Sequence, residues 1–238
     1  MSIEKGAISK KWLIALIATN VVFRERVRDS REKVAGVLFF IAVTQFILGF
    51  IISEALYPGY SVSDNTISDL GIGPSSIIFN SSVFLLGFLL LIGTYFLRQI
   101  FNFKIVNTLL FFTAMGLMGI GVFTKDFIIV HSAMALIAFF FAGLSAISSY
   151  KVLKKPLSLI SLVLGMMTLG ALVLFISGII TSGSLTSYEV YDSNLFLGLG
   201  PGGMERMIVY PALMWFAGFS GHLVTQQVGS DVNASNQT

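Results

Sequence analysis

The sequence predicts an all-α integral membrane protein, in which six transmembrane helices form one bundle preceded by an N-terminal interfacial amphipathic helix. The first observation is composition: 55% of the 238 residues are hydrophobic and 11% are charged, whereas soluble domains carry about 25% charged residues. The second is that the apolar residues fall in long runs, which is typical of membrane-spanning helices. The mean hydropathy of +0.86 agrees with both observations.

Six apolar runs are long enough to span a bilayer. We predict spans at residues 34–52, 77–97, 105–123, 127–149, 157–181 and 207–225. Each run has roughly the 17–25 residues that cross a hydrocarbon core at about 1.5 Å rise per residue. The chain then divides into a cytoplasmic basic and interfacial segment (1–33), a six-span membrane domain (34–226) and a disordered cytoplasmic tail (227–238), without a separate soluble domain.

The run from Trp12 to Phe23 is also apolar, but its twelve residues are too few to span a membrane. Basic residues flank it on both sides and no small-residue cleavage site follows, so a signal peptide is not expected. We predict a helix lying on the cytoplasmic leaflet, with the basic residues from Arg24 to Lys33 near anionic head groups. The alternative is a helix packed against the bundle.

The basic residues are distributed unevenly about the predicted spans. Thirteen of the fifteen lie on the side of the N terminus, and Lys125 and Arg206 lie on the other. The positive-inside rule therefore places both termini in the cytoplasm of a multi-pass protein of the cell (plasma) membrane. Because the basic residues adjoin the spans, the net charge of +3 does not indicate a nucleic acid partner. The absence of cysteine excludes disulfides, thiolate metal ligands and a thiol nucleophile.

The segment between the first two spans has the richest polar chemistry. Residues 57–71 (YPGYSVSDNTISDLG) contain no Lys or Arg, but they contain two aspartates, an asparagine and several hydroxyl groups. A simple tether between helices does not need these groups, so we predict an ordered extracytoplasmic loop that carries a binding site. Its candidate ligand-binding residues are Tyr60, Asp64, Asn65, Ser68 and Asp69.

Two more polar groups begin spans on the same side. Asp126 and His131 begin the fourth span, and ionisable side chains in spans usually face the protein interior or a wet cavity. His131 is either functional or a neutral side chain that bonds a carbonyl or a loop aspartate. Glu205, Arg206 and Tyr210 begin the sixth span and complete the candidate ligand-binding set.

Arg206 has two interpretations. In the first it forms a structural salt bridge to Asp69, Asp64 or Glu205, and we predict that Asp69 is its partner across the outer mouth of the bundle. In the second it binds a phosphate or carboxylate head group, because the planar guanidinium suits both.

The fourth span also carries a stripe of small residues, which helical spacing places on one face. Such a face lets another helix approach closely, so this span is expected to be central. The stripe consists of Ala135, Ala138, Ala142, Ser145 and Ser149.

Several chemistries lack support. Ser220 and His222 in GFSGH are two residues apart, so on a helix they do not face each other as a nucleophile and base would. Metal-ligand spacings such as H-x-x-x-H are missing. The glycines of GLGPGG lie between spans and not between a strand and a helix. We therefore predict no metal and no cofactor.

The chain resembles the family called domain of unknown function 998, made of polytopic membrane proteins. The resemblance lies in Y-P-x-Y and N-T-I-S-D-L-G after the first span, in G-x-F-x-x-D-x-x-x-x-H (Gly121 to His131), and in the E-R pair Glu205 and Arg206. It covers roughly residues 34–226 and implies a six-helix bundle without supplying an activity. The family is distantly similar to the Frag1/DRAM/Sfk1 group, which by analogy alone suggests lipid-related roles.

Three functions follow as hypotheses. The first is a non-catalytic membrane protein that binds a lipid head group or a partner protein at the extracytoplasmic site; its partners would be membrane lipids, a partner membrane subunit or a second copy of the chain. The second is a membrane-embedded hydrolase or transferase acting on a lipid or lipid-linked substrate, with His131, Asp69 or Asp126 as catalytic candidates. The third is a small-solute transporter.

Overall fold

The computed structural model describes residues 3–98, 104–184 and 192–225. The described part of the chain is helical, with six long helices: α1 (Ile3–Ala55), α2 (Ser76–Leu97), α3 (Lys104–Val122), α4 (Ile128–Ser149), α5 (Leu157–Thr181) and α6 (Gly200–Thr225). Short 3-10 turns precede α2, α4 and α6: η1 (Ile67–Gly71), η3 (Lys125–Phe127) and η4 (Asn194–Phe196). The predicted tail lies outside the described residues.

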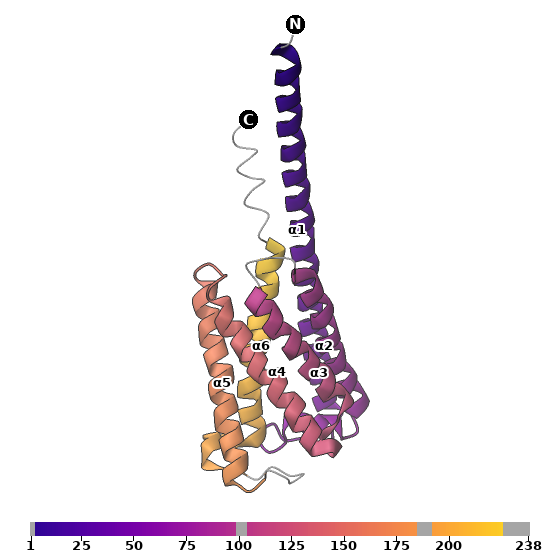
Figure 1. The fold of residues 1–238 in the computed structure, drawn as a ribbon. Helices are drawn as coiled ribbons and strands as arrows, with labels where there is room; N and C mark the ends of the chain where they lie inside the picture. Colours follow the sequence, from indigo (N-terminus) through magenta and orange to yellow (C-terminus); the bar gives the residue numbers. More distant parts are fainter. Residues whose placement is uncertain (1–2, 99–103, 185–191, 226–238) are drawn as a thin grey trace.

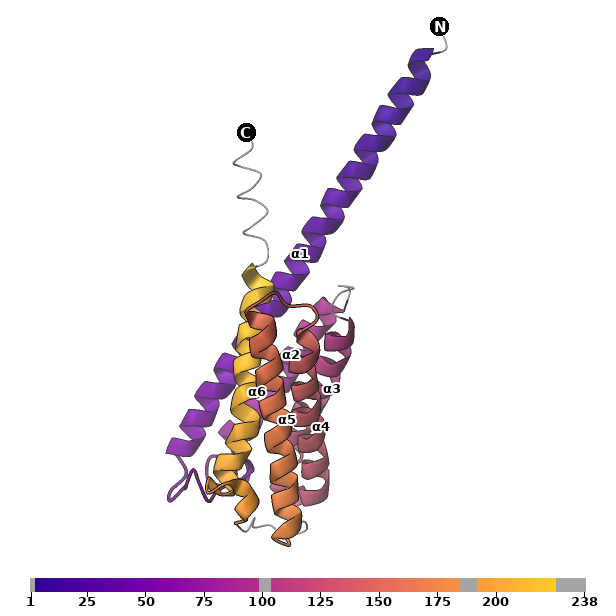
Figure 2. The same cartoon turned by 90° about the vertical axis from the view of Figure 1, so that its left-hand side faces the viewer.

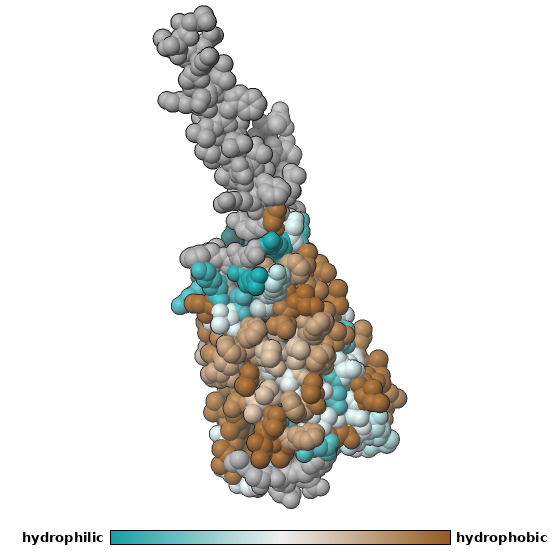
Figure 3. Space-filling view, turned by 45° about the vertical axis from the view of Figure 1, so that its right-hand side comes forward, coloured by the Kyte–Doolittle hydropathy of each residue, from teal (hydrophilic) through white to brown (hydrophobic). Residues whose placement is uncertain are grey.

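Each of the six helices contains a stretch long and apolar enough to cross a membrane, which confirms the predicted class. The α5 helix has the predicted bounds, and the other spans differ from prediction mainly in α6, which begins at Gly200 and not at residue 207. Apolar side chains cover the flank of the bundle in Figure 3, while hydrophilic ones gather near the end from which α1 projects. This distribution is expected of a protein surrounded by lipid.

The helices form a ring, because each packs against the next and α6 returns to pack against α1. The ring brings the first loop (residues 56–75) and the N-terminal end of α6 to the same end of the bundle (Figures 1 and 2). We call this end, which also carries η3 and η4, the loop end. The chain's N terminus and the last turn of α6 lie toward the opposite end.

The predicted N-terminal helix is present, and its backbone continues without a break into the first span. Residues 12–23 therefore belong to α1, a single helix of 53 residues whose N-terminal half extends beyond the bundle (Figure 2). The proposed position of that half on the membrane surface stays a prediction.

The small-residue face of α4 packs as predicted. Ala138, Ala142, Ser145 and Ser149 are buried, and a Cβ placed on Gly116 of α3 would collide with the backbone of Ala138. The helix also contacts α6 across the ring. A small face thus permits close approach of helix backbones, and it carries the start of α4 toward the bundle interior.

Candidate functional site

The first loop is held against the start of α6 by direct backbone contact. The Gly202 N–H donates to the Ser63 carbonyl at 2.8 Å, and the Ser63 hydroxyl donates to the Leu199 carbonyl at 2.9 Å. A Cβ at Gly200 or Gly202 would overlap carbonyl oxygens of this loop. The glycines of GLGPGG therefore allow two backbones to touch, and this contact explains why α6 starts earlier than the apolar run predicts.

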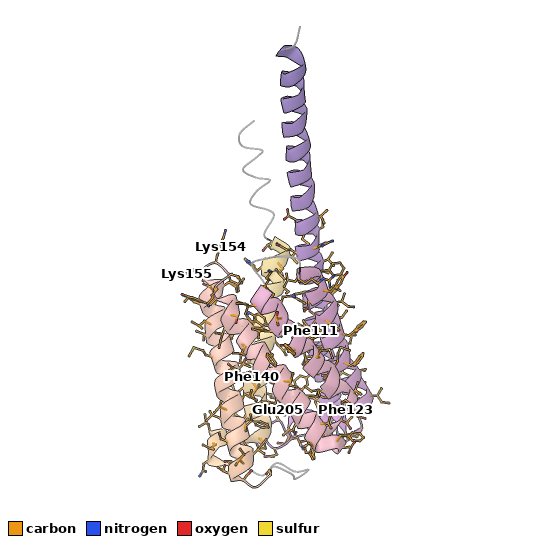
Figure 4. The ribbon with its side chains drawn as sticks, viewed as in Figure 1. Phe111, Phe123, Phe140, Lys154, Lys155 and Glu205 are labelled. Atoms are coloured by element: carbon orange, nitrogen blue, oxygen red, sulfur yellow. The ribbon has the colours of Figure 1, made fainter. Side chains whose placement is uncertain are left out.

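Beneath the loop lies a group of polar side chains drawn from η1, η3, α4 and α6, which we call the Ser68 cluster. Figure 4 shows Glu205 near the loop end, far from Lys154 and Lys155 at the other end. The apolar side chains of Ile67 and Leu70, which are nearly fully buried, anchor η1 over the bundle core. The cluster consists of Ser68, Asp69, Lys125, His131 and Glu205.

One half of the Ser68 cluster is an ion pair. Lys125 Nζ lies 2.5 Å from Asp69 Oδ1, and the two side chains are 5% and 14% exposed. The second carboxylate oxygen of Asp69 accepts from the Thr66 N–H at 2.8 Å and closes the turn that begins η1. The predicted Asp69–Arg206 ion pair is therefore wrong, because the nearer cation at this position is Lys125.

The other half of the cluster is a chain of three side chains. His131 Nε2 lies 3.0 Å from Ser68 Oγ, and Ser68 Oγ lies 3.1 Å from Glu205 Oε1. The Ile67 N–H donates to the second oxygen of Glu205 at 2.6 Å. The other nitrogen of the imidazole, His131 Nδ1, lies 2.8 Å from the Phe123 carbonyl oxygen. Histidine is thus bonded to a carbonyl, as one interpretation predicted, and also to a hydroxyl.

Hydrogen-bond counting restricts where the protons of this chain can lie. A carbonyl can only accept, so His131 Nδ1 carries a proton toward Phe123. The Ser68 hydroxyl has a single proton and faces two acceptors. In the first arrangement, Ser68 donates to His131 Nε2 and a protonated Glu205 donates to Ser68. In the second arrangement, a protonated His131 donates to Ser68, and Ser68 donates to an ionised Glu205. The two arrangements hold the same number of protons, so the Ser68 hydroxyl can relay one between the other groups.

Arg206 belongs to a second group, the Arg206 cluster, made with Glu54 and Tyr60. Its guanidinium forms an ion pair with Glu54 and donates a hydrogen bond to Tyr60 Oη at 2.9 Å. It also donates to the carbonyls of Val62 and Gly202 at 3.0 and 2.9 Å. The cluster therefore ties the end of α1 and the first loop to α6.

Tyr60 links this cluster to the first loop. Its hydroxyl donates to the Thr66 carbonyl at 3.1 Å while it accepts from Arg206. Burial raises the pKa of Tyr60 above its ordinary value of 10.0, and the hydrogen bond from Arg206 opposes this effect without overcoming it. The phenol thus stays neutral at physiological pH and keeps its proton for Thr66.

The remaining predicted residues are not gathered in either cluster. Asp64 is exposed and accepts from the Ser61 hydroxyl at 2.7 Å, and Asn65 accepts from the Ser61 N–H at 2.9 Å. Asp126 is exposed and accepts from Thr124 at 3.0 Å. These three residues shape turns of the loop end.

Tyr210 lies a turn along α6 from the Arg206 cluster. The residue is 39% exposed, and its ring meets the Phe50 ring edge-on, with ring centroids 6.4 Å apart. Its place on the flank of the bundle does not join it to the Ser68 cluster.

Two cavities meet at Ser68 and Glu205. The first, of about 50 Å³, lies in the bundle core, and apart from Ser68, Thr113 and Glu205 its lining is apolar. The second, of about 130 Å³, lies between α4 and α5 and includes Lys125 and His131 in its lining. Ala135 and Phe139 of α4 also line both cavities. Cavities of this size hold a few water-sized groups, so the helices that line them would have to separate to admit a lipid chain.

The sequence reasoning missed two residues. Glu54 lies in the last turn of α1 and Lys125 begins η3, and the sequence analysis gives neither residue a role. Their positions at the ends of spans carry the signal that could have found them, because charges near the membrane boundary seek partners. Among the residues that the structure describes, no group of three or more His, Cys, Asp or Glu is placed to hold a metal ion.

The fold and its buried polar clusters define a multi-pass membrane protein. The family model described as Protein of unknown function (DUF998) matches residues 40–222, and the chain belongs to this family. This match confirms the resemblance seen in the sequence, while the more distant likeness to the Frag1/DRAM/Sfk1 group stays a prediction. Comparisons with curated proteins and with solved structures find no match.

Proposed function

We propose that this chain binds a membrane lipid, with an acyl chain in the apolar cavity of the bundle core and the adjoining polar part of the lipid at the Ser68 cluster. The observation that carries the proposal is that the two cavities share Ser68 and Glu205. An apolar space that ends on hydrogen-bonding groups matches the chemistry of an amphiphile.

The length of the apolar cavity supports a chain-like occupant. Its lining runs along α6 from Glu205 to Phe216, which is roughly 16 Å at about 1.5 Å per residue. On α4 the lining runs from Ala135 to Ala142. An elongated apolar space along the helix axes suits an acyl chain better than a compact polar solute, so the transporter hypothesis gains no support here.

Charge balance favours recognition of an ester or hydroxyl group over a phosphate. Lys125 is paired with Asp69, and Arg206 is paired with Glu54. Neither cation offers an unbalanced positive charge, while Ser68, His131 and Glu205 offer hydrogen-bonding groups beside the cavities. In this proposal Arg206 has a structural role and does not clamp an anion.

The orientation belongs to the same proposal. The uneven distribution of Lys and Arg supports cytoplasmic termini in the cell membrane, and it would place the Ser68 cluster at the outer leaflet. The bound lipid would then come from that leaflet.

The test is to purify the protein in mild detergent and identify bound lipid by native mass spectrometry. We expect the wild type to retain lipid, and Ala135→Leu to lose it because the added atoms enter both cavities. Ala133→Leu is the matched control, since this alanine on the same helix is exposed and lines neither cavity. Equal lipid retention by the two variants, or none by the wild type, would overturn the proposal.

A further inference from the structure

The hydroxyl of Ser68 is placed as a nucleophile beside its base. We propose that Ser68 accepts an acyl group from a lipid ester, with His131 as the general base; the substrate's position rests on the lipid-binding function proposed above. The inference stands on the 3.0 Å separation of Ser68 Oγ and His131 Nε2 at the mouth of the apolar cavity.

The geometry has the three parts that activate a serine. A nucleophile lies within hydrogen-bond reach of a base, and the base is oriented by a third group. Here the third group is the Phe123 carbonyl, which receives the proton of His131 Nδ1 and leaves Nε2 free to take the Ser68 proton. Ser68 belongs to η1 and His131 to α4, and the two residues are 63 positions apart in sequence. A local sequence motif therefore cannot identify the pair.

The position of Ser68 also matches the substrate. Ser68 lines both cavities, so a lipid whose acyl chain fills the apolar one would bring its ester carbonyl beside Ser68 Oγ. The lining of the second cavity adds His131 and Lys125 on the polar side. His131 and Glu205 are buried while Ser68 is half-buried, so the base is shielded from bulk water and the nucleophile is still reachable.

The reaction balances with Ser68, His131, the lipid ester and one water or acceptor alcohol. The Ser68 oxygen attacks the ester carbonyl carbon while its proton moves to His131 Nε2, and the carbonyl electron pair moves to oxygen. The intermediate collapses by breaking the bond to the lipid alcohol, which leaves with the proton from His131. Water or an acceptor alcohol then attacks the acyl–Ser68 ester, gives its proton to His131, and the returning Ser68 oxygen recovers that proton.

One neighbour has a supporting role. Glu205 is a positioning residue, because it fixes η1 through the Ile67 N–H and because, when its carboxyl is protonated, it donates to Ser68 Oγ and leaves the Ser68 hydroxyl to donate to His131 Nε2.

The experiment uses the full chain in nanodiscs. The purified protein is treated with a fluorophosphonate probe, and separately with vesicles of dioleoyl phosphatidylethanolamine and dioleoyl phosphatidylglycerol followed by an acid quench. We expect the probe to label Ser68, and the quenched protein to gain the mass of one oleoyl group there. Labelling should be lost in Ser68→Ala and fall at least about 100-fold in His131→Gln.

The control is Ser81→Ala, because the Ser81 hydroxyl bonds carbonyls of its own helix outside both cavities and should not affect labelling. A wild type that retains lipid yet takes neither probe nor oleoyl group would overturn the nucleophile proposal and leave lipid binding intact. Labelling of Ser68 without retained lipid would support the nucleophile and refute the proposed occupant. Labelling that survives His131→Gln unchanged would remove His131 as the base.

Discussion

The pairing of charges at the loop end gives a sharp test by double-mutant cycle. The structure pairs Arg206 with Glu54 and Asp69 with Lys125, whereas charge counting in the sequence paired Arg206 with Asp69. The perturbations are Glu54→Ala and Arg206→Met, singly and together. Methionine keeps most of the arginine's volume, so the measured effect is mainly the loss of charge and donors.

The structure sets the expected magnitudes. Breaking a fully buried ion pair costs about 3–5 kcal/mol, because the remaining charge is stranded. The Arg206 side chain is 6% exposed and that of Glu54 is 24% exposed. Removing Glu54 should therefore cost roughly 3 kcal/mol, while removing Arg206 should cost roughly 2 kcal/mol because water reaches the remaining Glu54. Hydrogen bonds to charged groups are worth about 1.5–3 kcal/mol, which is the coupling expected between the two changes.

The assay is reversible unfolding in mixed lipid and SDS micelles, which reports the free energy of unfolding without requiring a known activity. The double variant should lose clearly less stability than the sum of the single variants. The same cycle with Asp69→Ala and Arg206→Met should be additive within about 0.5 kcal/mol, since these side chains share no contact. Additivity for Glu54 with Arg206, or strong coupling for Asp69 with Arg206, would refute the pairing drawn from the structure.

Three further predictions follow from the topology, the loop contact and the pKa of Tyr60. A cysteine at Ser63 should react with an impermeant maleimide in intact cells and one at Ser235 should not; the reverse pattern would invert the proposed orientation. Gly202→Ala should lower the unfolding free energy by about 1–3 kcal/mol, because the Cβ would overlap the Val62 and Asn65 carbonyls, whereas Gly170→Ala, with open space around it, should be neutral or stabilising. Because burial raises the pKa of Tyr60, the folded chain keeps the phenol proton at a pH where the unfolded chain loses it. Stability should fall as the pH rises above about 10, and less steeply in Tyr60→Phe; equal slopes would contradict this.

The spans could be predicted because the bilayer imposes a simple rule on length and composition. A run of about 20 apolar residues is visible in sequence whatever it packs against, and α5 accordingly has the predicted bounds. The start of α6 could not be predicted this way. Gly200 to Gly203 are helical because the first loop lies on them, and that contact joins residues more than 130 positions apart.

The candidate site shows the same limit more sharply. The sequence identified Ser68, Asp69, His131 and Glu205 as polar residues at one end of the bundle, and the structure brings them together. The sequence could not show which acid pairs with which base. Several acids and two basic residues lie at this end, and no spacing rule connects residues on different helices.

The adjacent residues Glu205 and Arg206 show why the partners differ from expectation. Neighbouring residues on a helix point about 100° apart, so an acid and a base in sequence do not face each other. Glu205 turns toward Ser68 and the cavities, while Arg206 turns toward Glu54 at the end of α1. One dipeptide thus fastens the first loop to α6 through two separate clusters. The Arg206 cluster holds the loop in place, and that leaves the Ser68 cluster beneath it with a fixed geometry in which a hydroxyl, an imidazole and a carboxyl can share a proton.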